Sequence, residues 1–188
     1  MDFEIEIKEF RIPLALIFLC ALVMSFIIGG LVPLTNENAR HLYDALKKLR
    51  EEITSERDYV KLALRIYFHN ASLAILMVLP LVGVVWSFIT LFTTGLALNA
   101  FLTVKGIGGA IGKLPYLSLS LIEPHSILEF VSYSLLSSEG VILSLYLKGG
   151  KIREGLRSAF KVIIISLLVL LFAALIEAYM ITILKARP

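Results

Sequence analysis

Four ionisable side chains lie inside long apolar stretches of this sequence. His125, Glu129 and Glu139 belong to one stretch, and Glu177 belongs to another. A charged group at the centre of a bilayer is costly, so such residues usually face the protein interior or water and mark functional sites. The three carboxyl groups have no obvious basic partner in the chain. We therefore expect each of them to be protonated, hydrated, or bound to a cation or proton.

Helical spacing places the first three of these residues on one face. At 100° per residue, four polar side chains fall within about 80° of arc on the helix surface. They are His125, Glu129, Ser132 and Glu139. An imidazole and a carboxylate one turn apart can supply two ligands to a cation. We predict a cation or proton site formed by His125, Glu129 and Glu177, with a divalent cation such as zinc as the candidate cofactor. The alternative is structural: a protonated Glu that joins two helices contributes on the order of 1 kcal/mol.

Other polar residues receive structural predictions. Glu139, Asn70 and Asn99 are predicted intramembrane polar groups, and the two asparagines are expected to cap helix ends because they bracket a long apolar stretch. His41 and His69 lie near the predicted membrane edges and are expected at the surface.

The chain lacks the short motifs of common enzymes. It contains no HExxH, GxSxG or P-loop motif, and no GxGxxG motif between a strand and a helix. Its single cysteine, Cys20, excludes an intrachain disulfide framework and a multi-thiolate metal site. We therefore predict no catalytic and no cofactor-binding residue, and favour a protein that is not an enzyme.

The elements that must position the ionisable groups are long apolar helices. Hydrophobic residues make up 58% of the 188 residues and the mean hydropathy is +0.86, more than a soluble domain needs. About 20 apolar residues in a helix span the bilayer core. We predict an all-α fold, a polytopic transmembrane helical bundle that forms one membrane domain over residues 1–188. Its five spans are expected near 12–33, 70–90, 92–112, 124–147 and 158–184.

Three further segments complete this prediction. The alternating pattern of residues 1–11 indicates a short strand or an interfacial stretch, and 36–64 has the spacing of one amphipathic helix capped by Thr35. The uncharged stretch 68–104 is too long for one span, so a turn is predicted near 89–95, at Thr93-Thr94-Gly95. The path of 106–122 stays open between a spanning and a re-entrant segment.

Charge and small residues predict orientation and partners. Residues 148–161 carry five basic side chains and one acid, so they and the N-terminus are predicted to be cytoplasmic in a multi-pass protein of the cell membrane. Small residues at 21, 25 and 29 share a face that suits helix packing. The predicted partners are the lipid bilayer, a second copy in a homodimer or larger assembly, and membrane-associated proteins. The net charge of +3 is small and its basic residues are dispersed, so nucleic acid is not predicted.

Several of these residues together resemble the stage II sporulation protein M family. The resemblance covers about residues 65–184 and rests on Asn70, Gly83, Asn99, LIEPHSILEF (121–130), Gly140 and ALIEAY (174–179). Its most specific part is Pro124, His125 and Glu129, although this chain has Ser126 and Ala100 where family members usually have glycine. The resemblance implies a polytopic membrane protein. The namesake helps to assemble a peptidoglycan-degrading complex in spore-forming bacteria, but relatives also occur without sporulation, so that role is not transferred.

Three functions remain open at this point. The first prediction is a non-enzymatic scaffold or organiser of a membrane process, held together by a buried His/Glu cluster. The second is a transporter or channel for a cation, proton or small solute that uses the same cluster as its site. The third is a metal-dependent intramembrane hydrolase, ranked lowest because catalytic zinc needs three protein ligands and an open position.

Overall fold

The computed structural model describes residues 3–56 and 58–186. Its seven helices follow in chain order: α1 (Phe3–Leu31), α2 (Asn36–Thr54), α3 (Tyr59–Met77), α4 (Val82–Val104), α5 (Gly109–Ile122), α6 (Pro124–Lys148) and α7 (Ile152–Ala186). No strand occurs within the described ranges, which confirms the predicted all-α class. The strand expected as one possibility at 1–11 is wrong from residue 3 onward, because α1 already begins there. The other possibility, an interfacial stretch, stays a prediction.

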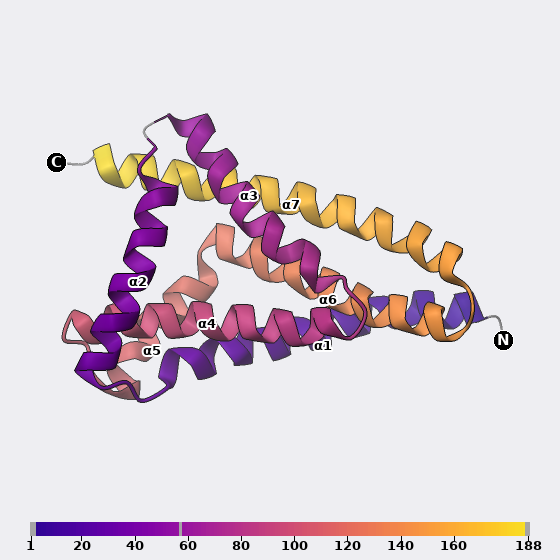
Figure 1. Ribbon diagram of the computed structural model, residues 1–188, viewed down its shortest axis with the longest axis horizontal. Coiled ribbons are helices and arrows are strands. Elements are labelled where there is room, and N and C mark those ends of the chain that lie inside the picture. Colours follow the sequence, from indigo (N-terminus) through magenta and orange to yellow (C-terminus); the bar gives the residue numbers. More distant parts are fainter. Residues whose placement is uncertain (1–2, 57, 187–188) are drawn as a thin grey trace.

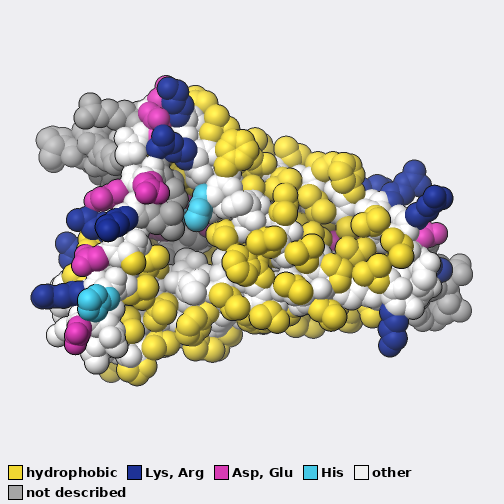
Figure 2. Space-filling view, in the orientation of Figure 1, with side chains coloured by type: hydrophobic (Ala, Val, Ile, Leu, Met, Phe, Trp, Pro, Cys, Tyr) yellow, Lys and Arg dark blue, Asp and Glu magenta, His cyan; other side chains and the backbone are white. Residues whose placement is uncertain are grey.

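Four of the described helices are long and apolar enough to cross a membrane. Their apolar segments are Glu9–Leu31, Val82–Val104, Pro124–Lys148 and Ile152–Ile183. On the face shown in Figure 2, apolar side chains form a band around the middle of the molecule, while Lys, Arg, Asp and Glu gather at its two ends. Apolar surface of this extent is unfavourable in water and favourable in lipid. The chain is therefore an integral membrane protein.

Two further helices contribute to the same bundle without belonging to those four. α3 carries Lys61 and Arg65 in its first half, and it packs against α4, α6 and α7. α5 is apolar but only 14 residues long. The stretch 106–122, whose path the sequence left open, thus forms a turn and this short helix. α2 crosses the end of the bundle opposite the start of α1 (Figure 1).

The predicted amphipathic helix 36–64 is divided into α2 and α3. Thr35 caps the start as expected, since its hydroxyl oxygen accepts a hydrogen bond from the backbone N–H of Asn38 at 3.2 Å. α2 ends at its C-cap residue Ser55. Asp58 then caps α3, because its carboxylate accepts from the backbone N–H of Lys61 at 2.9 Å. Asp is a strong N-cap residue, so it favours a new helix start over continuation of the old one.

The predicted turn near 89–95 is wrong, because α4 runs through this segment without a break. Thr93 and Thr94 donate their hydroxyl hydrogens to backbone carbonyls of the preceding helical turn, which satisfies them inside the helix. Gly95 packs against α1, where an added Cβ would collide with the carbonyl oxygen of Phe26. The chain turns instead around Pro80, where Leu81 adopts a positive φ of 63°. The spans expected near 70–90 and 92–112 are replaced by α3 and α4.

The core lies where α1, α4 and α6 meet. Its main cluster contains buried apolar side chains from six helices: Leu22, Phe26, Ala74, Met77, Leu91, Leu117, Phe130, Tyr133, Leu136 and Leu170. Phe26 and Phe130 meet edge to face, with ring centroids 5.7 Å apart. This packing fixes the first half of α6, which carries His125 and Glu129, against α1.

Candidate functional site

A cavity of about 500 Å³ opens among the helices beside this core. Side chains from α1, α3, α4, α5, α6 and α7 line it, together with Glu123 between α5 and α6. Its ionisable and amide side chains are His69, Asn70, Glu123, His125, Glu129 and Glu177. The structure therefore brings the three residues of the predicted cation or proton site, and Asn70, to one place. Their role as a site stays a prediction.

Glu129 is held in this cavity by a neighbour on another helix. The side-chain amide of Asn70 donates a hydrogen bond to its Oε1 at 2.6 Å. Asn70 is buried within α3, and Glu129 lies in the second turn of α6. The prediction that Asn70 caps a helix end is therefore wrong. Asn70 fixes one carboxylate oxygen of Glu129 at the cavity.

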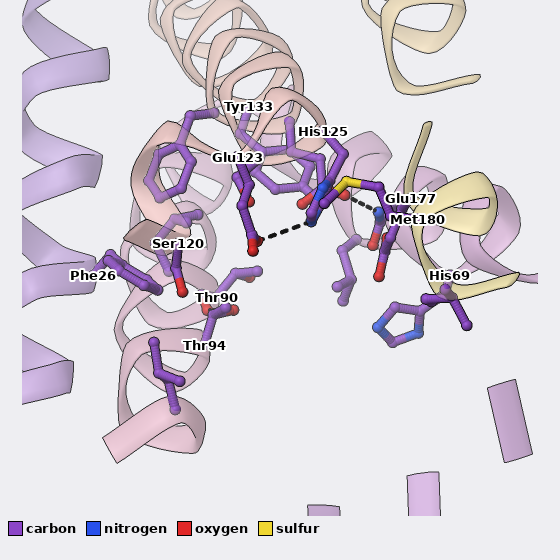
Figure 3. Close-up of a pocket in the computed structure, with 18 residues that line it drawn as sticks. Phe26, His69, Thr90, Thr94, Ser120, Glu123, His125, Tyr133, Glu177 and Met180 are labelled. Carbon is purple, nitrogen blue, oxygen red and sulfur yellow. Dashed lines mark hydrogen bonds and ion pairs between the residues drawn. The ribbon is translucent and has the colours of Figure 1, made fainter. Parts of the chain in front are cut away.

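His125 and Glu123 form a second pair at the start of α6. Pro124 occupies the first helical position, which suits a residue without a backbone N–H. Glu123 precedes it and His125 follows it, so both lie at the helix start. The Nε2 of His125 lies 3.6 Å from Oε2 of Glu123, and Figure 3 shows both side chains at the cavity. At this distance the contact is an ion pair when the imidazole is protonated, and not a close hydrogen bond. His125 Nδ1 is buried and has no hydrogen-bond partner among the residues that the structure describes.

Glu177 reaches the cavity from α7 (Figure 3). It lies close enough to Glu129 for the two carboxyl groups to interact electrostatically. Two carboxylates that share a small space repel one another unless a proton or a cation lies between them. The cavity therefore combines an amide-anchored carboxyl group with a second one from a different helix, and this arrangement suits a positively charged ligand.

The metal prediction requires ligands that converge more closely. Among the described residues, no group of three or more His, Cys, Asp or Glu side chains is arranged to hold a metal ion. A zinc hydrolase needs three such ligands and an open position for water. His125, Glu129 and Glu177 line one cavity but do not form such a set. The geometry thus gives no support to the hydrolase.

The remaining cavity lining includes residues that sequence reasoning placed elsewhere or passed over. His69 was expected at the surface, but it is half-buried and lines the cavity; His41 is exposed as expected. Hydroxyl groups on α4, α5 and α6 complete the polar lining: Thr90, Thr94, Ser120, Ser126 and Tyr133. Two features of the sequence could have indicated that His69 lies inside the bundle: it is next to Asn70, and the charged residues of its helix all come before it.

Asn99 lies outside this cavity and joins three other elements. It is fully buried, and its amide donates to the carbonyl oxygens of Gly29 at 3.3 Å and Val32 at 2.7 Å. These carbonyls belong to the C-terminal end of α1, so Asn99 caps a helix as predicted, but not its own. Its Oδ1 accepts from the ammonium of Lys113, which also bonds Thr103 at 2.8 Å. The group fastens α5 to α4 and α1.

Glu139 also lies outside the cavity and has a basic partner. Nη2 of Arg11 lies 3.0 Å from its Oε1 and donates a second hydrogen bond to the hydroxyl of Ser158. The expectation that Glu139 lacks a cationic partner is therefore wrong. Arg11 was overlooked because it stands one residue before the predicted span. Ser132, on the same predicted polar face, is fully buried and donates to the carbonyl oxygen of Ser166.

Comparison with known proteins identifies the family. The family model described as Stage II sporulation protein M matches residues 14–181, which is most of the chain and includes every residue of the cavity. Comparisons with curated proteins and with solved structures give no significant match. The match agrees with the helical membrane bundle and with the resemblance carried by Pro124, His125 and Glu129. The chain belongs to the Stage II sporulation protein M family.

Proposed function

We propose that this protein is a membrane transport protein that binds a small cationic solute or proton in the cavity between α3, α6 and α7. The observation that carries the proposal is the cavity itself. Its volume of about 500 Å³ lies within the range of small-molecule sites, roughly 300–1,000 Å³. Side chains that served only to join helices would pack against each other and leave no such space.

The charge of the lining supports a cationic ligand. Three carboxyl groups and two imidazoles face the cavity, and among the lining residues that the structure describes none is Lys or Arg. Carboxyl groups within a membrane bundle are typical of ion and proton pathways. Asn70 anchors Glu129 from the neighbouring helix, which keeps one carboxyl group in place for a ligand.

The second candidate function is the non-enzymatic scaffold or organiser that the sequence favoured. The observation in its favour is α2, a strongly amphipathic helix with exposed charged side chains at one end of the bundle. Such a helix can dock a membrane-associated partner. This role needs no ligand in the cavity, so the two candidates separate by experiment.

We propose an orientation in which the N-terminus lies in the cytoplasm. The start of α1 and the connection between α6 and α7 lie at one end of the bundle, joined by the hydrogen bond from Arg11 to Ser158. The basic segment 148–161 supports a cytoplasmic location for this end. The chain then passes along the bundle five times, through α1, α3, α4, the α5–α6 pair and α7. α2 lies on the outer side, and the cavity lies in the half nearer to it.

Flux measurements on the purified protein test the transport proposal. The protein is placed in liposomes, and gradients of Na⁺, K⁺, Mg²⁺, Zn²⁺ and guanidinium are applied in turn; proton movement is followed with a pH-sensitive dye inside, and each cation by its uptake into the liposomes. We expect saturable flux of at least one of these ions or of protons. Glu129→Gln keeps the acceptor for Asn70 but removes the charge, and should reduce the flux at least about tenfold.

The matched control is Glu154→Gln, which removes an exposed carboxylate outside the cavity and should leave the flux unchanged. Each variant is first checked for its size in detergent and its helix content. Absence of flux for every ion in the wild-type protein contradicts the transport proposal and favours the scaffold. Equal loss in both variants would contradict a specific role for the cavity.

A further inference from the structure

A second, apolar groove lies between α1, α6 and α7, away from the polar cavity. Its volume is about 240 Å³, and its walls are apolar side chains and small serines apart from the pair formed by Arg11 and Glu139. Along α1 it extends from Arg11 to Leu19, a rise of about 12 Å at 1.5 Å per residue. The groove thus begins at a charged end and continues along the helices into the apolar belt.

The charged end of the groove can accept an anion. Among the residues that the structure describes, Arg11 bonds Glu139 and Ser158, both through Nη2, and its buried Nε has no acceptor. A guanidinium has five N–H donors, so the remaining ones suit the oxygens of a phosphate. Lys161 stands exposed next to Val162 of the groove wall, and Arg157 is exposed beside Ser158. The described charged residues at this end of the bundle are mostly basic: Arg11, Lys148, Lys151, Arg153, Arg157 and Lys161, against Glu9, Glu139 and Glu154.

We propose that this groove binds one membrane lipid with an anionic phosphate headgroup. The phosphate lies at Arg11, and one hydrocarbon chain lies along Ile12, Leu16 and Leu19. A lipid is the occupant that fits because the groove is apolar along its length and basic at one end. Basic sites between transmembrane helices on the cytoplasmic side recognise anionic headgroups in this way.

Lipid binding is measured by native mass spectrometry after delipidation. Phosphatidylglycerol is added to the purified protein, and phosphatidylcholine of the same chain length is added in parallel. We expect phosphatidylglycerol to bind at least about tenfold more tightly. Ala15→Phe, which fills the groove, should lower this affinity by a similar factor. Glycerol phosphate, which has the headgroup chemistry but no chain, should not compete.

Ile17→Phe is the matched control, because Ile17 lies two residues away on α1 but is 59% exposed and outside the groove. It should bind phosphatidylglycerol as the wild type does. If Ala15→Phe does not fold, Ser134→Leu obstructs the opposite wall. The combined change Arg11→Met with Glu139→Gln removes both charges together and should abolish the headgroup preference. Wild-type binding in the folded groove-filling variants, or equal affinity for both lipids, would overturn the proposal.

Discussion

Arg11 at the start of α1 and Glu139 in α6 form an ion pair of 3.0 Å across 128 residues of sequence. Glu139 is 2% exposed and Arg11 is 24% exposed, so the carboxylate depends on this partner far more than the guanidinium does. The pair is one of the contacts that hold the first helix against the sixth at the end of the bundle where α1 begins.

Arg11→Met should therefore destabilise the protein by about 3 kcal/mol, because it leaves a buried carboxylate without its charged partner. Glu139→Gln alone should cost less, since the partly exposed guanidinium can turn towards water. The double variant should recover much of the loss, as the uncompensated charge is then gone. Thermal or denaturant unfolding in detergent measures all three. Additive losses in the double variant would contradict the pairing.

The close approach of α1 and α4 gives a second prediction. Gly29 and Gly95 face the backbone of the opposite helix, and a Cβ at either position would collide with a carbonyl oxygen. Gly95→Ala must push the two helices apart, at a cost of about 1–3 kcal/mol or more. Gly112→Ala in α5 is the control, because its Cβ would meet only Ile107 at an ordinary 3.5 Å. It should be neutral or slightly stabilising.

A third prediction concerns Asn99, which caps α1 from α4. Asn99→Leu keeps the approximate volume but leaves the carbonyl oxygens of Gly29 and Val32 without a donor, and Lys113 loses its acceptor. The expected cost is about 2–4 kcal/mol, as several buried polar groups lose a partner together. Lys113→Met alone should cost less. A double-mutant cycle should show clear coupling between the two residues, and its absence would place Lys113 outside this network.

Much of the fold could be predicted from the sequence because lipid imposes simple rules. Apolar runs of span length became helices, and Thr35 begins a helix as predicted because its side chain accepts from a nearby backbone N–H group. The error near Thr93 and Thr94 has a physical cause. In a helix these hydroxyls bond back to the preceding turn, so they do not break it. The glycine beside them permits helix contact.

The cavity could be predicted only in part. His125 and Glu129 are one turn apart, so their common face followed from helical geometry. That Glu177 and His69 would join them depends on how α3 and α7 pack against α6, which no local pattern contains. The pairing of Glu139 with Arg11 could not be predicted either, because it also depends on how two helices pack. Arg11 lies far away in sequence and reaches the carboxylate only after α1 has packed on α6.

The last prediction tests access to the cavity and its charge with a single introduced thiol. Cys20 is first replaced by serine, and Ser126→Cys then places the thiol at the cavity lining. A cationic methanethiosulfonate should modify it at least about tenfold faster than an anionic one, because a cleft lined by carboxyl groups concentrates cations. Reaction in liposomes should occur from the side that holds α2, as the proposed orientation requires.

Ser132→Cys is the control for this experiment, since Ser132 lies on the same helix but is fully buried and bonded to the carbonyl oxygen of Ser166. It should react with neither reagent while the protein is folded. Equal rates for the two reagents at Ser126→Cys would mean that the carboxyl groups do not set the potential of the cavity. The proposal of a cationic ligand would then fail even if the cavity is open. No reaction at all would show that the cavity is closed to solutes of this size, which removes transport of an organic cation and leaves the flux measurement to decide between protons or metal ions and the scaffold.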